Sequence, residues 1–122
     1  MRFIFLVGFL LFNSCYQPNR DCNAFKIGEF YSEVYVNGQT YKSLFVRTDA
    51  IQVETYNEKT DSSYVRWINE CEVIFKTIHP KNRIEKKDIH LKILTTTDSS
   101  YTFEYSYVGE TKKQKGTAYR IN

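Results

Sequence analysis

The feature that most constrains the fold of this chain is a series of short segments in which apolar and polar side chains alternate. A two-residue period fits a β-strand with one buried face, whereas an amphipathic helix repeats about every 3.6 residues. The clearest example is residues 65–78, which hold the only tryptophan and predict two strands joined by a tight turn at Asn69 and Glu70. The pattern therefore predicts an all-β fold built outward from a central hairpin.

Further strands are predicted on both sides of this hairpin. They cover residues 25–36, 41–48, 51–56, 89–93, 101–107 and 117–121. Asn37 and Gly38 give the strongest turn signal, because both central positions of a type I′ turn need positive φ. We expect polar loops at residues 57–62 and 81–88, and a bulge at Gly28, where the alternation changes phase.

About eight consecutive strands with short connections predict an antiparallel up-and-down meander. A strongly twisted sheet of this width tends to curl and close, which removes its exposed edges. We therefore predict a small closed β-barrel over residues 24–122, with a two-sheet β-sandwich as the alternative. Eight strands enclose an interior that side chains just fill, or that admits one small ligand.

Composition bounds the size of the protein and its partners. The 122 residues allow one domain, and 16% aromatic residues with only 2 prolines are typical of a β-rich globular chain. A net charge of +3 is too small to indicate binding to nucleic acid. Two basic segments, residues 81–87 and 112–115, suggest contact with RNA or anionic lipid, but charged loops that keep a barrel soluble explain them more simply.

The N-terminus carries a secretion signal. Arg2 precedes the unbroken apolar residues 3–12, a run too short for a membrane span of about 20 residues but suited to a signal peptide. Ser14 directly before Cys15 resembles the lipobox of bacterial lipoproteins, in which a peptidase cuts before a cysteine that then carries the lipid. An ordinary signal peptide or a buried N-terminal strand is the alternative.

The lipobox resemblance implies the division of the N-terminal region and a place in the cell. It implies a signal peptide at residues 1–14, lipidation and membrane anchoring at Cys15, and a tether at residues 15–23. Tyr16 follows the cysteine where the familiar inner-membrane retention signal has Asp. We therefore expect the protein on the outer membrane of a bacterial envelope, facing the periplasm.

A wider resemblance covers nearly the whole chain. Residues 66–72, which include Trp67 and Cys71, and the tail at residues 103–105 and 112–118 are similar to small Bacteroidota-type lipoproteins of unknown function. That family resembles minimal lipocalin-like barrels, so the resemblance implies the same fold here. Some members are labelled DNA topoisomerase IV, but this chain has no room for an ATPase or a cleavage domain, and its secretion signal points away from the chromosome.

Two cysteines remain after Cys15. Because an envelope location is oxidising, Cys22 and Cys71 can form a disulfide. The chain-entropy model predicts that a disulfide closing a loop of about 50 residues stabilises the fold by about 4 kcal/mol. The alternative is two free thiols too far apart to bridge.

Residues that could carry chemistry are few. His79 and His90 are the only histidines, and no metal-ligand spacing or catalytic motif surrounds them. We expect His79 at a strand end and His90 on the solvent side of its strand. We therefore predict no catalytic residue, no metal and no cofactor.

The stripe formed by Tyr101, Phe103, Tyr105 and Tyr107 has two interpretations. The small size of the barrel favours core packing. The alternative makes these four residues, with Trp67, the wall of a ligand site. From the lipocalin-like resemblance we expect a non-catalytic binding module for a small apolar or amphipathic molecule. The alternative function is an accessory envelope protein that acts through protein–protein contacts, with a packed interior and an exposed apolar patch.

Overall fold

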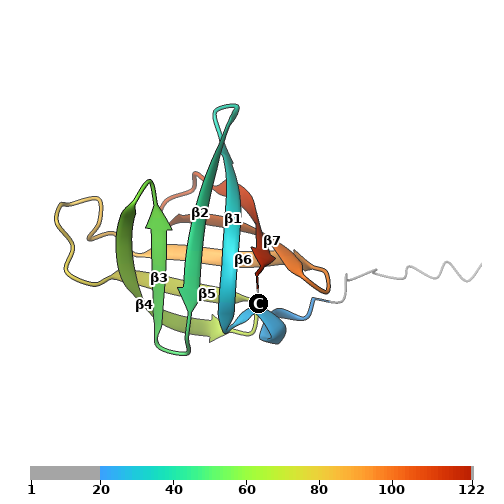
Figure 1. Cartoon of the computed structure of the whole chain (residues 1–122). Helices are drawn as coiled ribbons and strands as arrows, with labels where there is room; N and C mark the ends of the chain where they lie inside the picture. Colours follow the sequence, from blue (N-terminus) through green and yellow to red (C-terminus); the bar gives the residue numbers. More distant parts are fainter. Residues whose placement is uncertain (1–19, 122) are drawn as a thin grey trace, which may run out of the picture.

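The computed structural model describes residues 20–121, which form a closed barrel of eight antiparallel strands (Figure 1). The elements are η1 (Cys22–Phe25), β1 (Gly28–Val36), β2 (Gln39–Arg47), β3 (Ile51–Tyr56), β4 (Lys59–Asn69), β5 (Glu72–Thr77), β6 (Ile89–Thr96), β7 (Ser100–Tyr107) and β8 (Gln114–Arg120). Each strand pairs with its neighbours in sequence, and β8 pairs with β1. The predicted up-and-down barrel is confirmed, and the sandwich alternative is wrong. The predicted signal peptide and Cys15 lie outside the described residues.

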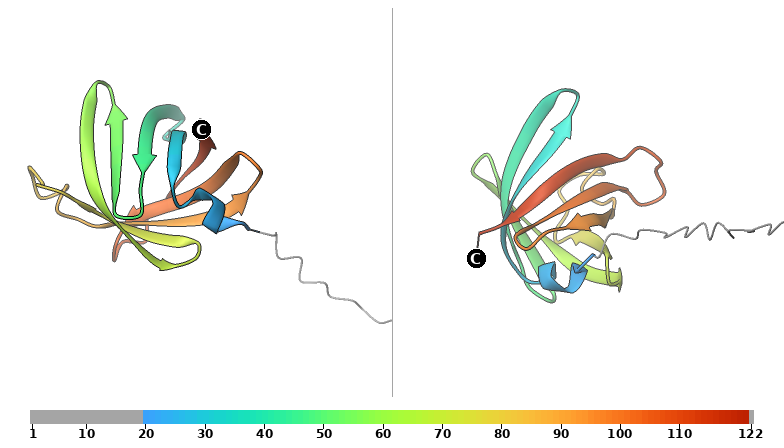
Figure 2. Two further views of the ribbon diagram at one scale, coloured as in Figure 1. Left: turned by 60° about the horizontal axis from the view of Figure 1, so that its bottom comes forward. Right: turned by 90° about the vertical axis from the view of Figure 1, so that its right-hand side faces the viewer.

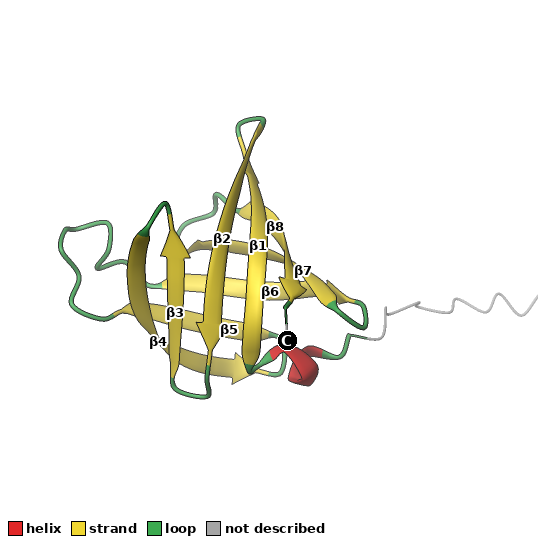
Figure 3. Ribbon diagram, viewed as in Figure 1, coloured by secondary structure: helices red, strands yellow, loops and turns green. Residues whose placement is uncertain are grey.

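The barrel has two different ends, because consecutive antiparallel strands place their connections at alternate ends. The closed end carries η1 and the β2–β3, β4–β5 and β6–β7 turns, and the C-terminal end of β8 lies near η1 (Figure 2). The open end carries the β1–β2 and β3–β4 turns and the longer β5–β6 and β7–β8 loops (Figure 3). Among the described residues, no helix is long and apolar enough to cross a membrane.

Turn chemistry explains one connection that was predicted and one that was not. Asn37 and Gly38 both have positive φ, as the predicted β1–β2 turn requires. Asn57 and Glu58 also have positive φ and make a two-residue turn between β3 and β4. The predicted loop at residues 57–62 is therefore wrong, because its last four residues, 59–62, belong to β4. Polar residues fit there because the inner face of this strand is itself polar.

The start of the barrel also differs from the prediction. The first strand begins at Gly28 and not at Phe25, because Cys22–Phe25 forms the 3-10 helix η1. The change of phase at Gly28 therefore marks the junction between helix and strand, and not a bulge within a strand. Since η1 begins at Cys22, the packed part of the chain reaches into the segment that we expected to be a tether.

The central hairpin turns one residue later than predicted. Its turn lies at Glu70 and Cys71, and a bulge between Trp67 and Asn69 adjusts the register of β4 against β5. The Asn69 side chain closes the turn, because its Oδ1 accepts a hydrogen bond of 2.9 Å from the Cys71 N–H. This bond from a residue two positions on is an Asx-turn, in which the side chain mimics a backbone turn.

The aromatic core gathers around η1 at the closed end. Phe25 is fully buried, with its ring centroid 5.2 Å from that of Tyr101 and 6.3 Å from that of Phe30. Phe30 in turn stacks on Phe45 at 5.0 Å. These rings fill the closed end of the barrel, so η1 acts as a plug whose apolar face completes the core.

Polar contacts fix this plug from several strands. The Arg20 guanidinium donates to the Ile93 carbonyl at 3.0 Å, and the Asp21 N–H donates to Thr96 Oγ1 at 2.9 Å. From the last strand, Arg120 donates to the Ala24 carbonyl. The closed end is therefore tied to β6 and β8 as well as packed against the core.

Candidate functional site

The interior toward the open end holds a cavity of about 370 Å³. Every strand from β1 to β7 contributes side chains to it, and the β5–β6 loop contributes Ile84, Glu85 and Lys87 at its mouth. A second hollow of about 340 Å³ lies toward the β7–β8 loop and shares Val36 and Tyr105 with the first. The interior is thus filled at the closed end and hollow at the open end.

One wall of the cavity is aromatic. It includes the whole stripe singled out in the sequence, Tyr101, Phe103, Tyr105 and Tyr107, together with Phe75 on β5. Tyr101 and Phe103 are nearly fully buried, and their ring centroids lie 5.8 Å apart. The two interpretations of the stripe therefore coexist, since the same residues pack the core and face the hollow. Binding of a ligand to them stays a prediction.

The other wall is polar, which sequence reasoning missed. Its inward-facing members come from β1 to β4: Ser32, Ser43, Gln52, Glu54, Asp61 and Ser63. Outward on the same strands lie Leu44 and Val46, which are 53% and 45% exposed. The predicted alternation is present, but on β2 and β3 its polarity is inverted. Alternation alone cannot say which face lies inside, because both faces have the same period.

Glu54 is the most perturbed carboxyl of the polar wall. Burial raises the pKa of Glu54, the nearby charge of Asp61 raises it further, and a hydrogen bond from Ser43 opposes both. Ser43 Oγ donates to Glu54 Oε2 at 3.4 Å and lies 2.8 Å from Ser32 Oγ. A chain of hydroxyls therefore leads from β1 to the carboxyl.

The two walls influence each other across the cavity. Burial raises the pKa of Tyr105, and the negative charge of Glu54 raises it further. A phenol that faces a carboxylate keeps its proton more firmly, because ionisation would place two negative charges together. The cavity therefore places a hydrogen-bonding phenol opposite a carboxyl group.

Arg47 separates the cavity from the plug. Its side chain is 1% exposed, and its guanidinium donates to the Phe25 carbonyl at 2.6 Å and to the Lys26 carbonyl at 3.1 Å. It also donates to Gln52 Oε1 at 3.0 Å and to the Tyr101 hydroxyl at 3.2 Å. The Arg47 donors thus satisfy the carbonyls at the end of η1, which have no strand partner, and Arg47 forms the floor of the cavity.

Trp67 does not reach the cavity. It lies close to the β4–β5 turn at the closed end, where its ring sits 5.4 Å from the Arg47 guanidinium and 5.3 Å from Lys26 Nζ. Its indole Nε1 is buried without a hydrogen-bond partner in the described part of the chain. The sequence placed Trp67 on an inward face correctly, but could not give its depth along the barrel axis.

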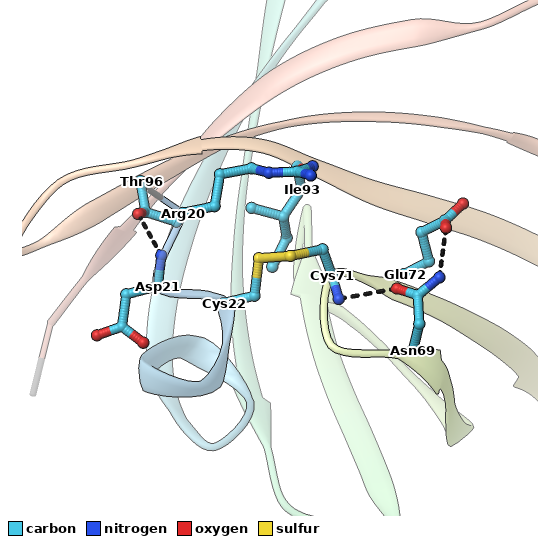
Figure 4. The surroundings of a disulfide bond; sticks show 8 residues. All are labelled: Arg20, Asp21, Cys22, Asn69, Cys71, Glu72, Ile93 and Thr96. Atoms are coloured by element: carbon cyan, nitrogen blue, oxygen red, sulfur yellow. Dashed lines mark hydrogen bonds between the residues drawn. A yellow bond between two sulfur atoms is a disulfide. The ribbon is translucent and has the colours of Figure 1, made fainter. Parts of the chain in front are cut away.

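A disulfide joins Cys22 of η1 to Cys71 of the β4–β5 turn (Figure 4). The two Cα atoms lie 5.2 Å apart, within the range that a disulfide spans. The predicted pairing is confirmed. Its effect is to fasten the plug covalently to the hairpin around which the strands are arranged.

A polar cluster lies on the outer surface beside this bond. Asn69 Nδ2 donates to Glu72 Oε2 at 2.5 Å, and His90 Nε2 lies 2.9 Å from Glu72 Oε1. The hydrogen bond from Asn69, followed by contact with His90, lowers the pKa of Glu72. His90 is therefore half-buried and paired, and not merely turned to solvent as expected. His79 lies exposed just beyond the end of β5.

The geometry defines a class of protein, a closed eight-stranded barrel with a plugged end and an internal cavity. No protein-family model, no curated protein and no solved structure matches the chain. Within residues 20–121, no three His, Cys, Asp or Glu side chains come together as a potential metal site.

Proposed function

We propose that this protein holds a small amphipathic molecule inside a barrel anchored to a bacterial envelope membrane. The observation that carries the proposal is the cavity of about 370 Å³, which has one aromatic wall and one hydrogen-bonding wall. Small-molecule sites usually measure about 300–1,000 Å³ and combine apolar lining with a few placed polar groups. A non-catalytic carrier or sensor of such a molecule needs no more than this.

The proposed location rests on the N-terminal sequence. Lipidation at Cys15 places the barrel on the periplasmic face of the outer membrane, with the plugged end next to the short tether. The disulfide supports this location, because such bonds persist in oxidising compartments. The mass of the mature protein tests the anchor. We expect cleavage before Cys15, a diacylglyceryl group joined to its sulfur and an acyl chain on its new α-amine, and an unmodified Cys15 would contradict it.

A matched pair of variants tests the proposed binding site. Ser63 points into the cavity, whereas its neighbour Ser62 points outward and pairs with Val53. We expect Ser63→Phe to fill the cavity and weaken binding of the neutral dye Nile red about tenfold or more, since one aromatic ring displaces a ligand of similar size. Ser62→Phe should bind the dye as the parent does. Equal binding by both variants would contradict the proposal.

A second candidate function is contact with another envelope protein. Its support is an apolar strip on the outer face of β2 to β4, formed by Leu44, Val46, Ile51, Val53 and Tyr64, all at least one-third exposed. A photo-crosslinking residue at Val46 should capture one defined partner in cells, whereas the same residue at Thr40 should not. Absence of a specific adduct at Val46 would leave only the binding-module function.

A further inference from the structure

We infer that the ligand of the cavity carries a protonated amine or another organic cation, held between the Glu54 and Asp61 carboxylates and the tyrosines of β7. This inference rests on the proposed binding function and names its ligand class. Three features of the cavity support it. Two carboxylates have no basic partner among the described residues, the nearby basic side chains form other contacts, and an aromatic wall faces the carboxylates.

The first feature is a pair of carboxylates on the inner face of the barrel. Glu54 on β3 and Asp61 on β4 are direct partners in the strand register, and both line the cavity, Glu54 partly buried and Asp61 exposed toward the open end. Within residues 20–121, neither forms an ion pair with Lys or Arg. The hydrogen bond that Glu54 accepts comes from the neutral Ser43. Two like charges directly opposite each other repel, and the Asp61 charge adds to the burial that raises the pKa of Glu54, so a cation bound beside the pair would relieve this repulsion.

The second feature is that the basic side chains of the cavity wall are engaged elsewhere. Lys42 Nζ lies 3.6 Å from Glu33 Oε1 on the outer surface. Lys87 Nζ lies 3.7 Å from Glu110 Oε2 at the mouth. Arg47 directs its donors to the backbone carbonyls at the end of η1, to Gln52 and to Tyr101. In this arrangement none of these three basic side chains forms an ion pair with Glu54 or Asp61.

The third feature is the aromatic wall opposite the pair. The charge of Glu54 is felt at Tyr105, so the carboxylate and the phenol ring face a common space. Tyr41 and Tyr56, whose ring centroids lie 6.3 Å apart, add further rings on the mouth side. Aromatic faces attract cations, and recognition of organic ammonium groups commonly combines such rings with a carboxylate.

An anionic head group does not fit the same space. It would lie beside the Glu54 and Asp61 carboxylates. The Arg47 guanidinium could not neutralise it, because its donors already bind backbone carbonyls, Gln52 and Tyr101. A cation would be attracted where an anion is repelled. A positive charge beside Glu54 would offset the burial and the Asp61 charge that raise the pKa of Glu54. The electrostatics of the cavity therefore select the sign of the ligand charge.

Three probes with one common body test the inference: phenylbutylamine, phenylbutanol and phenylbutyrate. Calorimetric titration would use the Cys15→Ser protein, purified with its disulfide intact. We expect the amine to bind about tenfold or more tightly than the alcohol, since a charge-assisted hydrogen bond contributes about 1.5–3 kcal/mol. Phenylbutyrate should bind most weakly.

Two substitutions locate the preference within the cavity. Glu54→Gln should reduce the amine-to-alcohol ratio to about threefold or less, by removing the charged partner of the amine. Asp61→Asn should reduce the ratio in the same direction. The matched control is Glu104→Gln, on the outer face of β7 and paired with Lys113 at 3.3 Å, which should leave the ratio unchanged.

The outcomes separate the inference from the function on which it rests. Equal affinity for the three probes would overturn the amine preference while leaving the binding function standing. A preference for the amine that survives both Glu54→Gln and Asp61→Asn would overturn the assignment to this carboxylate pair. If none of the probes binds, the proposed function fails and the inference fails with it.

Discussion

Removal of the Cys22–Cys71 disulfide should cost this barrel a large part of its stability. The bond joins residues 49 positions apart in the sequence. In the chain-entropy model, a closed loop of that length restrains the unfolded chain by about 4 kcal/mol at 25 °C. Small domains have a total free energy of unfolding of about 5–15 kcal/mol, so the loss is between about a quarter and most of it.

The perturbation is Cys22→Ser with Cys71→Ser, compared with the parent in a Cys15→Ser background. Urea unfolding can be followed by far-UV circular dichroism and by the fluorescence of Trp67, which lies beside the plug. With a slope of about 2 kcal/mol per M urea, a loss of 4 kcal/mol moves the midpoint by about 2 M. The parent measured under reducing conditions should give the same midpoint as the double variant.

Loss of the disulfide should also loosen η1 locally. Without the disulfide, η1 is still held by the burial of Phe25 and by the bonds from Arg47, so the folded barrel should keep its circular dichroism spectrum. Amide exchange at residues 22–25 should nevertheless rise relative to exchange in β7. A stability loss below about 1 kcal/mol would refute the loop-entropy argument, because it would mean that the unfolded chain is barely restrained by the bond.

Three further predictions concern single side chains. Gly116→Ala should destabilise the barrel by about 1–3 kcal/mol in thermal unfolding, because the new Cβ would meet the Glu33 carbonyl oxygen at 2.6 Å; an unchanged midpoint would contradict this packing. Glu54→Gln should stabilise the protein at pH 7 by up to about 1 kcal/mol by removing a charge that is disfavoured by burial and repelled by Asp61. Its gain should vanish below the ordinary carboxyl pKa, where Glu54 is neutral folded or unfolded, and a gain independent of pH would oppose this cause. Asn69→Ala should cost about 1 kcal/mol at pH 7. Part of that cost should disappear as the pH falls through the lowered pKa of Glu72, and a constant difference would exclude the charge-assisted bond.

The topology could be predicted because its signals are local. Asn37 and Gly38 predict a two-residue turn because both readily adopt positive φ, and strand alternation gives the number of strands. The loop expected at residues 57–62 failed for a related reason. Asn57 and Glu58 adopt the same left-handed conformation without a glycine, and the polar residues that predict a loop mark the inner face of β4.

The candidate site was only half predictable. The aromatic stripe on β7 was found because its alternation is strict and its face is apolar. The polar wall was not found, because which face of β2 and β3 lies inside depends on how the barrel closes. Arg47 is the clearest case, since its burial is offset by carbonyls of η1 that lie about 20 residues away in the sequence.

Depth along the barrel is a second property that alternation does not carry. Trp67 and Tyr105 both face inward, yet Trp67 lies behind the Arg47 floor and Tyr105 lines the cavity. Phe103 serves core and cavity together, and a Cβ at Gly116 would lie 2.7 Å from its ring. Phe103→Ser would therefore damage folding as well as binding, which makes Ser63→Phe the cleaner test of the site.

Native mass spectrometry of the Cys15→Ser protein, secreted into a bacterial periplasm and kept oxidised, tests the central claim most directly. We expect a small bound molecule that leaves on denaturation, contains an ionisable nitrogen and is absent from Ser63→Phe but present in Ser62→Phe. A bare protein in all three spectra would contradict the claim that the interior is a ligand site. It would move the function to the apolar strip on the outer face of β2 to β4.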